Sequence, residues 1–343
     1  MADNAAFIYS DDMEILEEMR TMRSTYADKS NYPRIGVDPL FLHTQFDLKF
    51  SKLEKIGDIH VSVEGKRLKN STVIVTLHDV GQNHKTCFES FFKFQPFKSV
   101  AERFTVYHLN FPGQHEKASE LQSDYSYPTM DRMADLVKDV LSHYDTKSAI
   151  CIGVGAGANV FLRLAQKYPS LVESLILFAG SARASTMSEQ AHAMIASHCL
   201  KARGVNRYCK NYFLWKCFGC VEHERNSALA TKVTSHLFRI KYPRNLAMFL
   251  ESYNSRTSIN LKKTSTDSGS LKCGMLLMVG ALSPALEDTI VLNSKLDPAS
   301  STWMKISDAT NMVLHEKPNA VANAIINFLQ GYGYAVKARA PSV

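Results

Sequence analysis

The chain has 343 residues, of which 45% are hydrophobic, and its formal net charge is +7. This apolar content is enough for a large buried core, and the positive charges are scattered, without the basic stripe and interleaved aromatic residues that indicate nucleic-acid binding. The chain does not start with a basic segment followed by an apolar run, and no apolar stretch is long enough to cross a bilayer. We therefore expect a cytoplasmic protein with no transmembrane segment.

Residues 1–42 differ in composition from the rest and are predicted to form an N-terminal arm. An acidic segment from Asp11 to Glu18 has the spacing of one amphipathic helix, and the turn-rich run NYPRIGVDPL follows it. Such a segment is either a partner-binding arm or a poorly ordered terminus. We expect the arm to be partly disordered.

Residues 43–333 alternate between two kinds of pattern. Short runs rich in β-forming residues occupy 58–63, 72–77, 104–110, 148–153, 174–179, 275–280 and 302–306. Segments with helical spacing include 130–143, 156–167, 285–294 and 318–330. Alternating strands and helices predict an α/β fold with a mainly parallel sheet that helices cover on both faces.

Two further segments have their own predictions. The strands ending near Ala179 and starting near Met275 are separated by about 95 residues with helical patterning, which is too long for a simple crossover. We therefore expect an inserted helical cap at about residues 181–265. Residues 334–343, YAVKARAPSV, are predicted to be a flexible C-terminal tail.

The stretch CIGVGAGANVFLRLAQKYP, residues 151–169, has the pattern of a buried strand, a glycine turn and a helix. Gly153, Gly155 and Ala158 satisfy the dinucleotide-binding pattern G-x-G-x-x-A. That fingerprint belongs to the first strand of its unit and needs a carboxylate at the end of the next strand, but here several strands come first and the next one ends LILFAGSAR. We therefore expect no cofactor.

The same turn also matches the nucleophile elbow G-x-S-x-G, in which the central residue carries the nucleophile. The central residue here is Gly155, which has no atom with which to attack a substrate. The expected position of the acid holds Ser283, and that of the base, before the EKP run, holds Asn311. Because all three triad positions are replaced, the sequence predicts a protein that is not an enzyme. A third interpretation, that the glycine turn has only a structural role, is compatible with an elbow that has lost its nucleophile.

Cysteine usage indicates free thiols. The seven cysteines are an odd number, which argues against a disulfide framework. Four of them fall in the predicted cap. A zinc site of the usual kind would need a second close pair or an H-x-x-x-H run beside the C-x-x-C run, and neither is present, so we expect no metal. Plain free thiols are expected for Cys199, Cys209, Cys217 and Cys220, with a metal site and a redox pair as the alternatives.

Several longer motifs carry a family resemblance. Read with NFPGQHEKAS, YSYPTMDRMADLV, GVGAGANVFLRLA, YNSRTSINL and FLQGYGY, the runs VTLHDVGQNHKTCF and NSKLDP make the chain resemble the N-myc downstream-regulated (NDR) family of α/β-hydrolase-like proteins. The resemblance implies an eight-stranded α/β-hydrolase core with a helical cap and no established hydrolase activity. It also places the family's elbow on residues 153–157 and its HD pair on His78 and Asp79.

Two functions are therefore expected in order of preference. The first is a non-catalytic adaptor that binds signalling proteins in cytoplasmic signalling, differentiation or stress responses. The second is a protein that binds a small apolar or lipid-like ligand in the former hydrolase pocket under the cap, lined near His78, Asp79, Gly153 and Ala156. Asp79 would place negative charge where an oxyanion should be stabilised, unless it only binds loop amides.

Overall fold

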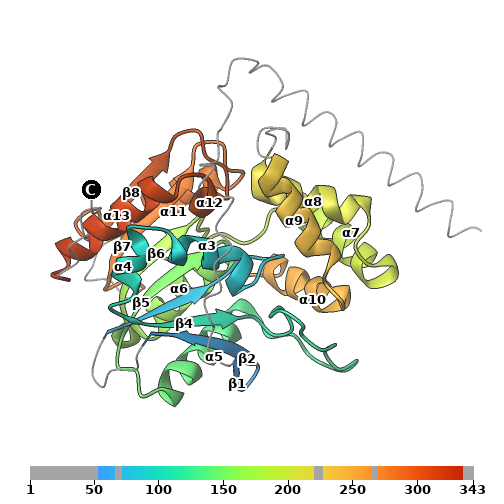
Figure 1. The fold of residues 1–343 in the computed structure, drawn as a ribbon, viewed down its shortest axis with the longest axis horizontal. Helices are drawn as coiled ribbons and strands as arrows, with labels where there is room; N and C mark the ends of the chain where they lie inside the picture. The colour runs from blue at the N-terminus through green and yellow to red at the C-terminus, as the bar shows by residue number, and fades with distance from the viewer. Residues whose placement is uncertain (1–52, 66–71, 220–226, 264–268, 335–343) are drawn as a thin grey trace, which may run out of the picture.

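The sheet has eight strands and mostly parallel pairing, as predicted. The computed structural model describes residues 53–65, 72–219, 227–263 and 269–334 (Figure 1), and the N-terminal arm lies outside these ranges. The strand order is β1-β2-β4-β3-β5-β6-β7-β8, with antiparallel pairing of β2 to β1 and β4 and parallel pairing elsewhere. The strands are β1 (Glu54–Ile56), β2 (Ile59–Glu64), β3 (Val73–Leu77), β4 (Thr105–Asn110), β5 (Ala149–Val154), β6 (Val172–Phe178), β7 (Gly274–Gly280) and β8 (Ser301–Ile306).

The central strands are parallel because their residues are apolar on both faces. Every residue of β3, β5 and β7 is buried, which is the composition of a strand covered by helices on both sides. Seven strands match the predicted runs. The eighth, β1, is three residues long at the edge of the sheet and too short to give an alternating pattern.

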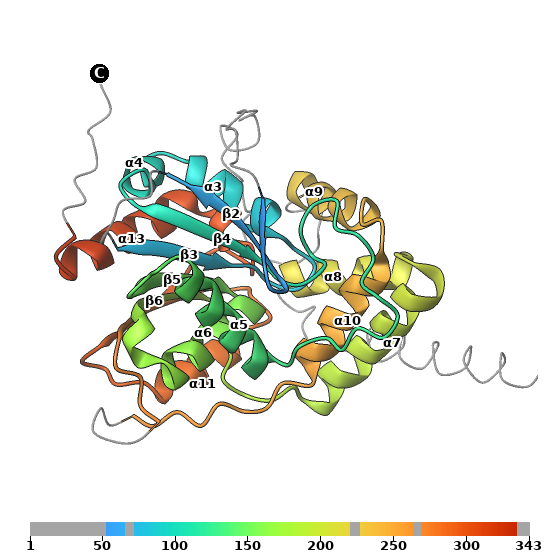
Figure 2. The same cartoon turned by 90° about the horizontal axis from the view of Figure 1, so that it is seen from below.

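Helices cover the two faces of the sheet separately (Figure 2). On one face lie α5 (Met130–His143), α6 (Ala156–Lys167) and α11 (Leu286–Ser294), whose apolar residues join the larger buried cluster. On the other face, the residues of the second cluster come from η1 (Lys85–Glu89), α3 (Ser90–Lys93), α4 (Phe97–Ala101), α12 (Val313–Glu316) and α13 (Pro318–Gly331). A short 3-10 helix, η2 (Pro169–Leu171), precedes β6. The four helices predicted from spacing are present as α5, α6, α11 and α13.

Four helices between β6 and β7 lie together beside the sheet and are called the cap helices below (Figure 1). They are α7 (Met187–Arg203), α8 (Arg207–Phe218), α9 (Ser227–Phe238) and α10 (Pro243–Asn254), all within the segment predicted as a cap. Thr186 and Glu189 form a capping box at the start of α7, and the Asn206 side chain caps α8. None of the helices that the structure describes is long and apolar enough to cross a membrane.

The last described residue, Tyr334, lies on the domain rather than in a tail. Its hydroxyl group contacts Thr72 and Glu173, and its ring centroid is 5.7 Å from that of Phe104. The domain therefore extends at least one residue past the predicted boundary at residue 333. Residues 335–343 fall outside the described ranges.

Candidate functional site

The glycine turn forms a sharp connection between β5 and α6. Gly155 has φ +52° and ψ −107°, and its amide donates to the carbonyl of Phe178 on β6 at 3.0 Å. This positive φ is the geometry that a nucleophile elbow requires, and glycine adopts it without the steric cost that a side chain would incur. The backbone of an elbow is therefore present, with a hydrogen atom in place of a nucleophile.

The carboxylate of Asp79, just after β3, lies at this elbow. Its Oδ1 atom accepts hydrogen bonds from the amides of Val80 at 2.8 Å and Ala156 at 2.9 Å. An oxyanion hole uses two donors of this kind, one from the residue after the nucleophile and one from the loop after the third strand. In this structure an internal carboxylate already binds both donors.

Asp79 also explains why residue 155 is glycine. A Cβ atom built on Gly155 would lie 2.2 Å from Cγ of Asp79, 2.3 Å from Oδ1 and 2.5 Å from Oδ2. These distances are shorter than any real contact between carbon and a carboxylate. The Asp79 side chain therefore fills the space that a nucleophilic side chain would need.

Ser283 and Asn311, predicted at the acid and base positions, contact each other. The Ser283 hydroxyl donates to Oδ1 of Asn311 at 2.5 Å and accepts from the amide of Ala285 at 3.0 Å. The Asn311 side chain donates to the carbonyl of Lys216 at 3.0 Å, and its backbone amide donates to the carbonyl of Cys217 at 3.1 Å. Asn311 thus connects the core to the end of α8.

His78 is a packed core residue. It is fully buried, its Nδ1 atom is 2.8 Å from the carbonyl oxygen of Asp79, and its Nε2 atom accepts from the amide of Phe111. Burial lowers the pKa of His78 to about 3, so the ring is neutral at physiological pH. Both ring nitrogens are engaged and neither is available as a general base. Gly153 and Ala156 are buried as well.

Lys216, on α8, has a charge that interacts with Asp79, and the sequence did not point to this residue. Burial alone would lower the pKa of Lys216, but the charge of Asp79 and the phenols of Tyr212 and Tyr253 act in the opposite sense, and the net pKa is raised. The Lys216 ammonium lies 5.2 Å from the Tyr253 ring centroid. A lysine on a cap helix has no sequence signal that would link it to Asp79, because the two are far apart in the chain.

Aromatic side chains of α8 occupy the space beneath the cap. A Cβ atom on Gly81, two residues after Asp79, would lie 2.8 Å from the ring of Phe213, which is itself buried. The Phe213 ring therefore lies against the loop that follows Asp79. A groove of about 470 Å³ lies elsewhere, between residues 125–131 and α10 with the residues just after it.

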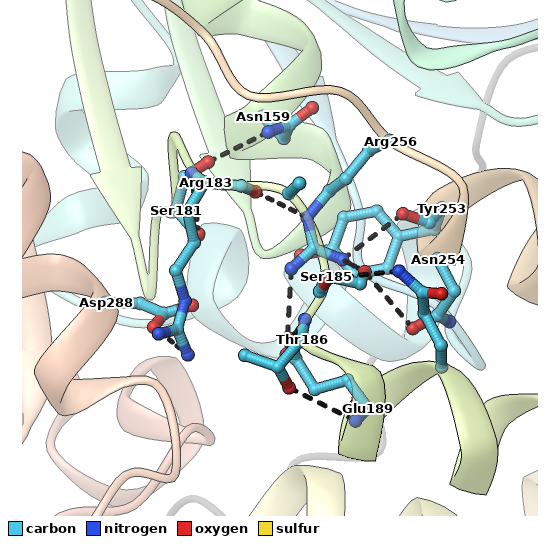
Figure 3. Close-up of polar contacts among 12 residues, drawn as sticks. Asn159, Ser181, Arg183, Ser185, Thr186, Glu189, Tyr253, Asn254, Arg256 and Asp288 are labelled. Atoms are coloured by element: carbon cyan, nitrogen blue, oxygen red, sulfur yellow. Dashed lines mark hydrogen bonds and ion pairs between the residues drawn. The ribbon is translucent and has the colours of Figure 1, made fainter.

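Buried polar contacts hold the base of the cap (Figure 3). The Arg256 guanidinium donates to the carbonyls of Arg183 at 3.1 Å and Tyr253 at 3.2 Å, contacts the Ser185 hydroxyl, and pairs with Glu189 at 3.6 Å. These contacts join the segment entering the cap to the segment leaving it. Nearby, Arg183 pairs with Asp288 at 2.6 Å. Asp288 is only 8% exposed in this packing.

The thiols that the structure describes are mostly buried. Burial raises the pKa of Cys209 to about 11 and that of Cys217 to about 12, and it raises the pKa of Cys151, which is fully buried in β5. No cluster of three or more metal-ligating side chains occurs in the described ranges. Cys220, the second cysteine of the C-x-x-C run, lies outside those ranges, so the pair itself is not described.

Comparison with known proteins decides the family. A sequence model of the Ndr family matches residues 51–336. The chain belongs to the Ndr family. It is 36% identical to Protein NDRG3 of Xenopus tropicalis over 282 residues, covering 81% of this chain and 71% of that protein. It is 34% identical to Protein NDRG1 of the same species over 280 residues, covering 81% of this chain and 69% of that protein. This finding confirms the resemblance drawn from the motifs.

Solved structures similar to this Ndr-family chain share its fold. A thermophilic esterase from Thermogutta terrifontis aligns with a TM-score of 0.64 at 19% identity, covering 83% of this chain and 98% of the esterase. An enol-lactonase from Burkholderia xenovorans aligns with a TM-score of 0.64 at 16% identity, covering 79% of this chain and 96% of the enol-lactonase. At these identities the similarity shows that the Ndr-family chain has an α/β-hydrolase fold, and nothing about its chemistry.

Proposed function

We propose that this chain is a non-catalytic α/β-hydrolase-fold protein that acts as an adaptor in cytoplasmic signalling, differentiation or stress response. One observation carries the proposal: the Asp79 carboxylate binds the amides of Val80 and Ala156 and fills the space beside Gly155. Acyl transfer needs a nucleophile at the elbow and positive dipoles free to bind the developing oxyanion. A fixed carboxylate at this place leaves no room for a nucleophile, occupies the two amide donors and would repel a developing oxyanion.

The proposed role relies on surfaces rather than on a reaction. The Ser283 and Asn311 side chains, at the positions predicted for the acid and the base, form a contact that connects the core to α8, which supports a structural use of these residues. A fold without its chemistry still presents loops and a cap on a rigid sheet, and such surfaces bind partners.

Hydrolysis of p-nitrophenyl acetate and butyrate by the full chain tests the absence of catalysis. We expect the rate of buffer alone for the native protein and for Ser283→Ala. The matched variant is Asp79→Asn, which keeps the size of the side chain and removes its charge. Turnover by the native protein that Asp79→Asn abolishes, in a variant that stays folded, would make Asp79 catalytic and overturn the proposal.

Proximity labelling in cells tests the adaptor role. The full chain is fused to a biotin ligase, and the Asp79→Asn variant is the control because its outer surface is unchanged. We expect both fusions to label the same set of proteins above the background of the unfused ligase. Labelling equal to that background contradicts an adaptor, and partners that only the native chain labels would place recognition at the elbow.

A further inference from the structure

Positive charge is concentrated in the cap segment. Residues 181–265 contain fourteen Lys and Arg residues and four Asp and Glu residues, whereas the whole chain has 40 and 33. The rest of the chain therefore has a net negative charge, although the chain as a whole is positive. Such asymmetry indicates that the cap binds something acidic.

The outer face of α7 is apolar and exposed. Met187 is 88% exposed and Met194 is 68% exposed, and both lie at seven-residue spacing with Lys201, which places the three side chains on one stripe of the helix. The opposite face of α7 buries Ala196 and Leu200 in the core. α7 therefore presents two exposed methionines on the side opposite its buried face.

Exposed basic residues lie at the end of this stripe. Gly204, just after α7, lies against the ring of Pro243 at the start of α10, since a Cβ on Gly204 would be 3.7 Å from the proline Cγ. This contact brings the end of α7 and the start of α8 next to the connection between α9 and α10. Arg203, Arg207, Arg239 and Lys241 are exposed there and form no ion pair with any residue that the structure describes.

One segment of the chain has the complementary character. Residues 7–20, FIYSDDMEILEEMR, contain five acidic residues and one basic residue. In a helix, Ile8, Ile15 and Met19 would share one face. The carboxylates of Asp11 and Glu18 would flank that face. An acidic amphipathic helix of this kind fits a surface that combines exposed methionines with unpaired basic side chains.

We propose that residues 7–20 dock as an amphipathic helix on the outer face of α7. The apolar face covers Met187 and Met194, and the flanking carboxylates lie near Arg203 and Arg207. Lys201, on the same stripe, already pairs with Glu251 at 2.6 Å. The connecting residues 21–52 can span up to about 100 Å when extended, so they do not limit the reach of the segment. Because the segment is tethered, its effective concentration is high and a weak contact suffices.

Carbodiimide coupling of the full chain tests the docking. This reagent joins carboxylates directly to lysine amines without a spacer, and peptide mapping locates each link. We expect links from Asp11–Glu18 to Lys201, Lys210 or Lys241, with a marked loss of yield in about 0.5 M salt, where surface ion pairs are screened. Equal coupling to lysines over the whole surface, including Lys98, Lys138 and Lys305, would overturn the proposal.

Two variants separate docking from chance encounter. Met187→Glu combined with Met194→Glu adds negative charge to the stripe and should reduce the links about tenfold, because both the apolar contact and the charge attraction are lost. Ile290→Glu, on the exposed face of α11, is the matched control and should leave the yield unchanged. Equal yields in all three proteins contradict docking on α7. In a mixture of ¹⁴N- and ¹⁵N-labelled chains, each cross-link should join two peptides with the same label. Cross-links that join a ¹⁴N peptide to a ¹⁵N peptide would show docking on a second copy instead.

Discussion

A Cβ atom on Gly155 would lie 2.2 Å from Cγ of Asp79, so these two positions share one volume and only one of them can carry a side chain. The same carboxylate accepts hydrogen bonds from the amides of Val80 and Ala156. Asp79 and Gly155 therefore depend on each other, since the carboxylate needs the space and the elbow keeps its backbone geometry only with glycine. This mutual dependence gives a direct test.

The stability cost of Gly155→Ala should depend on Asp79. The single substitution should destabilise the protein by about 3 kcal/mol, from strain at positive φ and the clash with the carboxylate. Asp79→Gly should cost about 2 kcal/mol, because two buried amides lose a charged acceptor. The double variant should lose at least about 1 kcal/mol less of unfolding free energy than the sum of the losses in the two single variants. Urea unfolding measures all three, with Asp124→Gly, at an exposed loop position, as control. Strict additivity would contradict the shared volume.

Asn311→Ala should loosen the end of α8. The substitution removes the hydrogen bond to the Lys216 carbonyl and leaves the Ser283 hydroxyl without its acceptor, at a cost of about 1–2 kcal/mol. Hydrogen exchange should become faster in residues 214–219 and stay unchanged in β5. Asn319→Ala, at an exposed position, is the control. Unchanged exchange in α8 would mean that Asn311 does not hold the cap.

Arg256→Lys should weaken the base of the cap even though the charge is kept. A lysine cannot reproduce the planar donors that contact the carbonyls of Arg183 and Tyr253, so we expect a loss of about 2 kcal/mol. Limited proteolysis should cut within residues 183–190 faster than in the native chain. The control is Arg132→Lys, whose side chain is 58% exposed and should have no measurable effect. Equal cleavage of both variants would argue against the role of Arg256.

Stability should fall as the pH decreases from about 6.5 to 4. Burial lowers the pKa of His84 and of His315 to about 4, and that of His78 to about 3. Below pH 6.5 the unfolded chain therefore binds protons that the folded chain does not, and each such histidine contributes up to about 1.4 kcal/mol per pH unit to the loss. His315→Gln keeps a donor for the carbonyl of Thr86 and should reduce the slope of unfolding free energy against pH. Asn319→Gln, at an exposed position without a titratable group, should leave the slope unchanged, and equal slopes for both variants would contradict the assignment.

The strands and helices of the core were predictable because their patterns are local. The continuous apolar runs of β3, β5 and β7 indicate buried parallel strands without knowledge of their neighbours. The elbow was also predictable, since the spacing of Gly153, Gly155 and Gly157 after a strand describes a turn of known geometry. The short edge strand β1 was missed, because three residues do not establish a period.

The contacts of the site were not predictable in the same way. The family resemblance places Asp79 beside the elbow but does not decide whether its carboxylate binds loop amides. The buried pair of Arg183 and Asp288 and the position of Lys216 near Asp79 had no local signal. Each of these interactions joins side chains that are far apart in the sequence. A local sequence pattern contains no information on contacts between separate elements.

By itself the sequence determined the family, the α/β class, the elbow turn and the absence of a side chain at Gly155, because each follows from residue identity and local spacing. Only the tertiary structure decided what fills the elbow. The Asp79 carboxylate occupies the space beside Gly155 because β3 and β5 pair in parallel, with Leu77 opposite Gly153. That register brings the loop after β3 within hydrogen-bond distance of the first amide of α6, and a carboxylate there is stabilised by two donors that no one-dimensional pattern could locate.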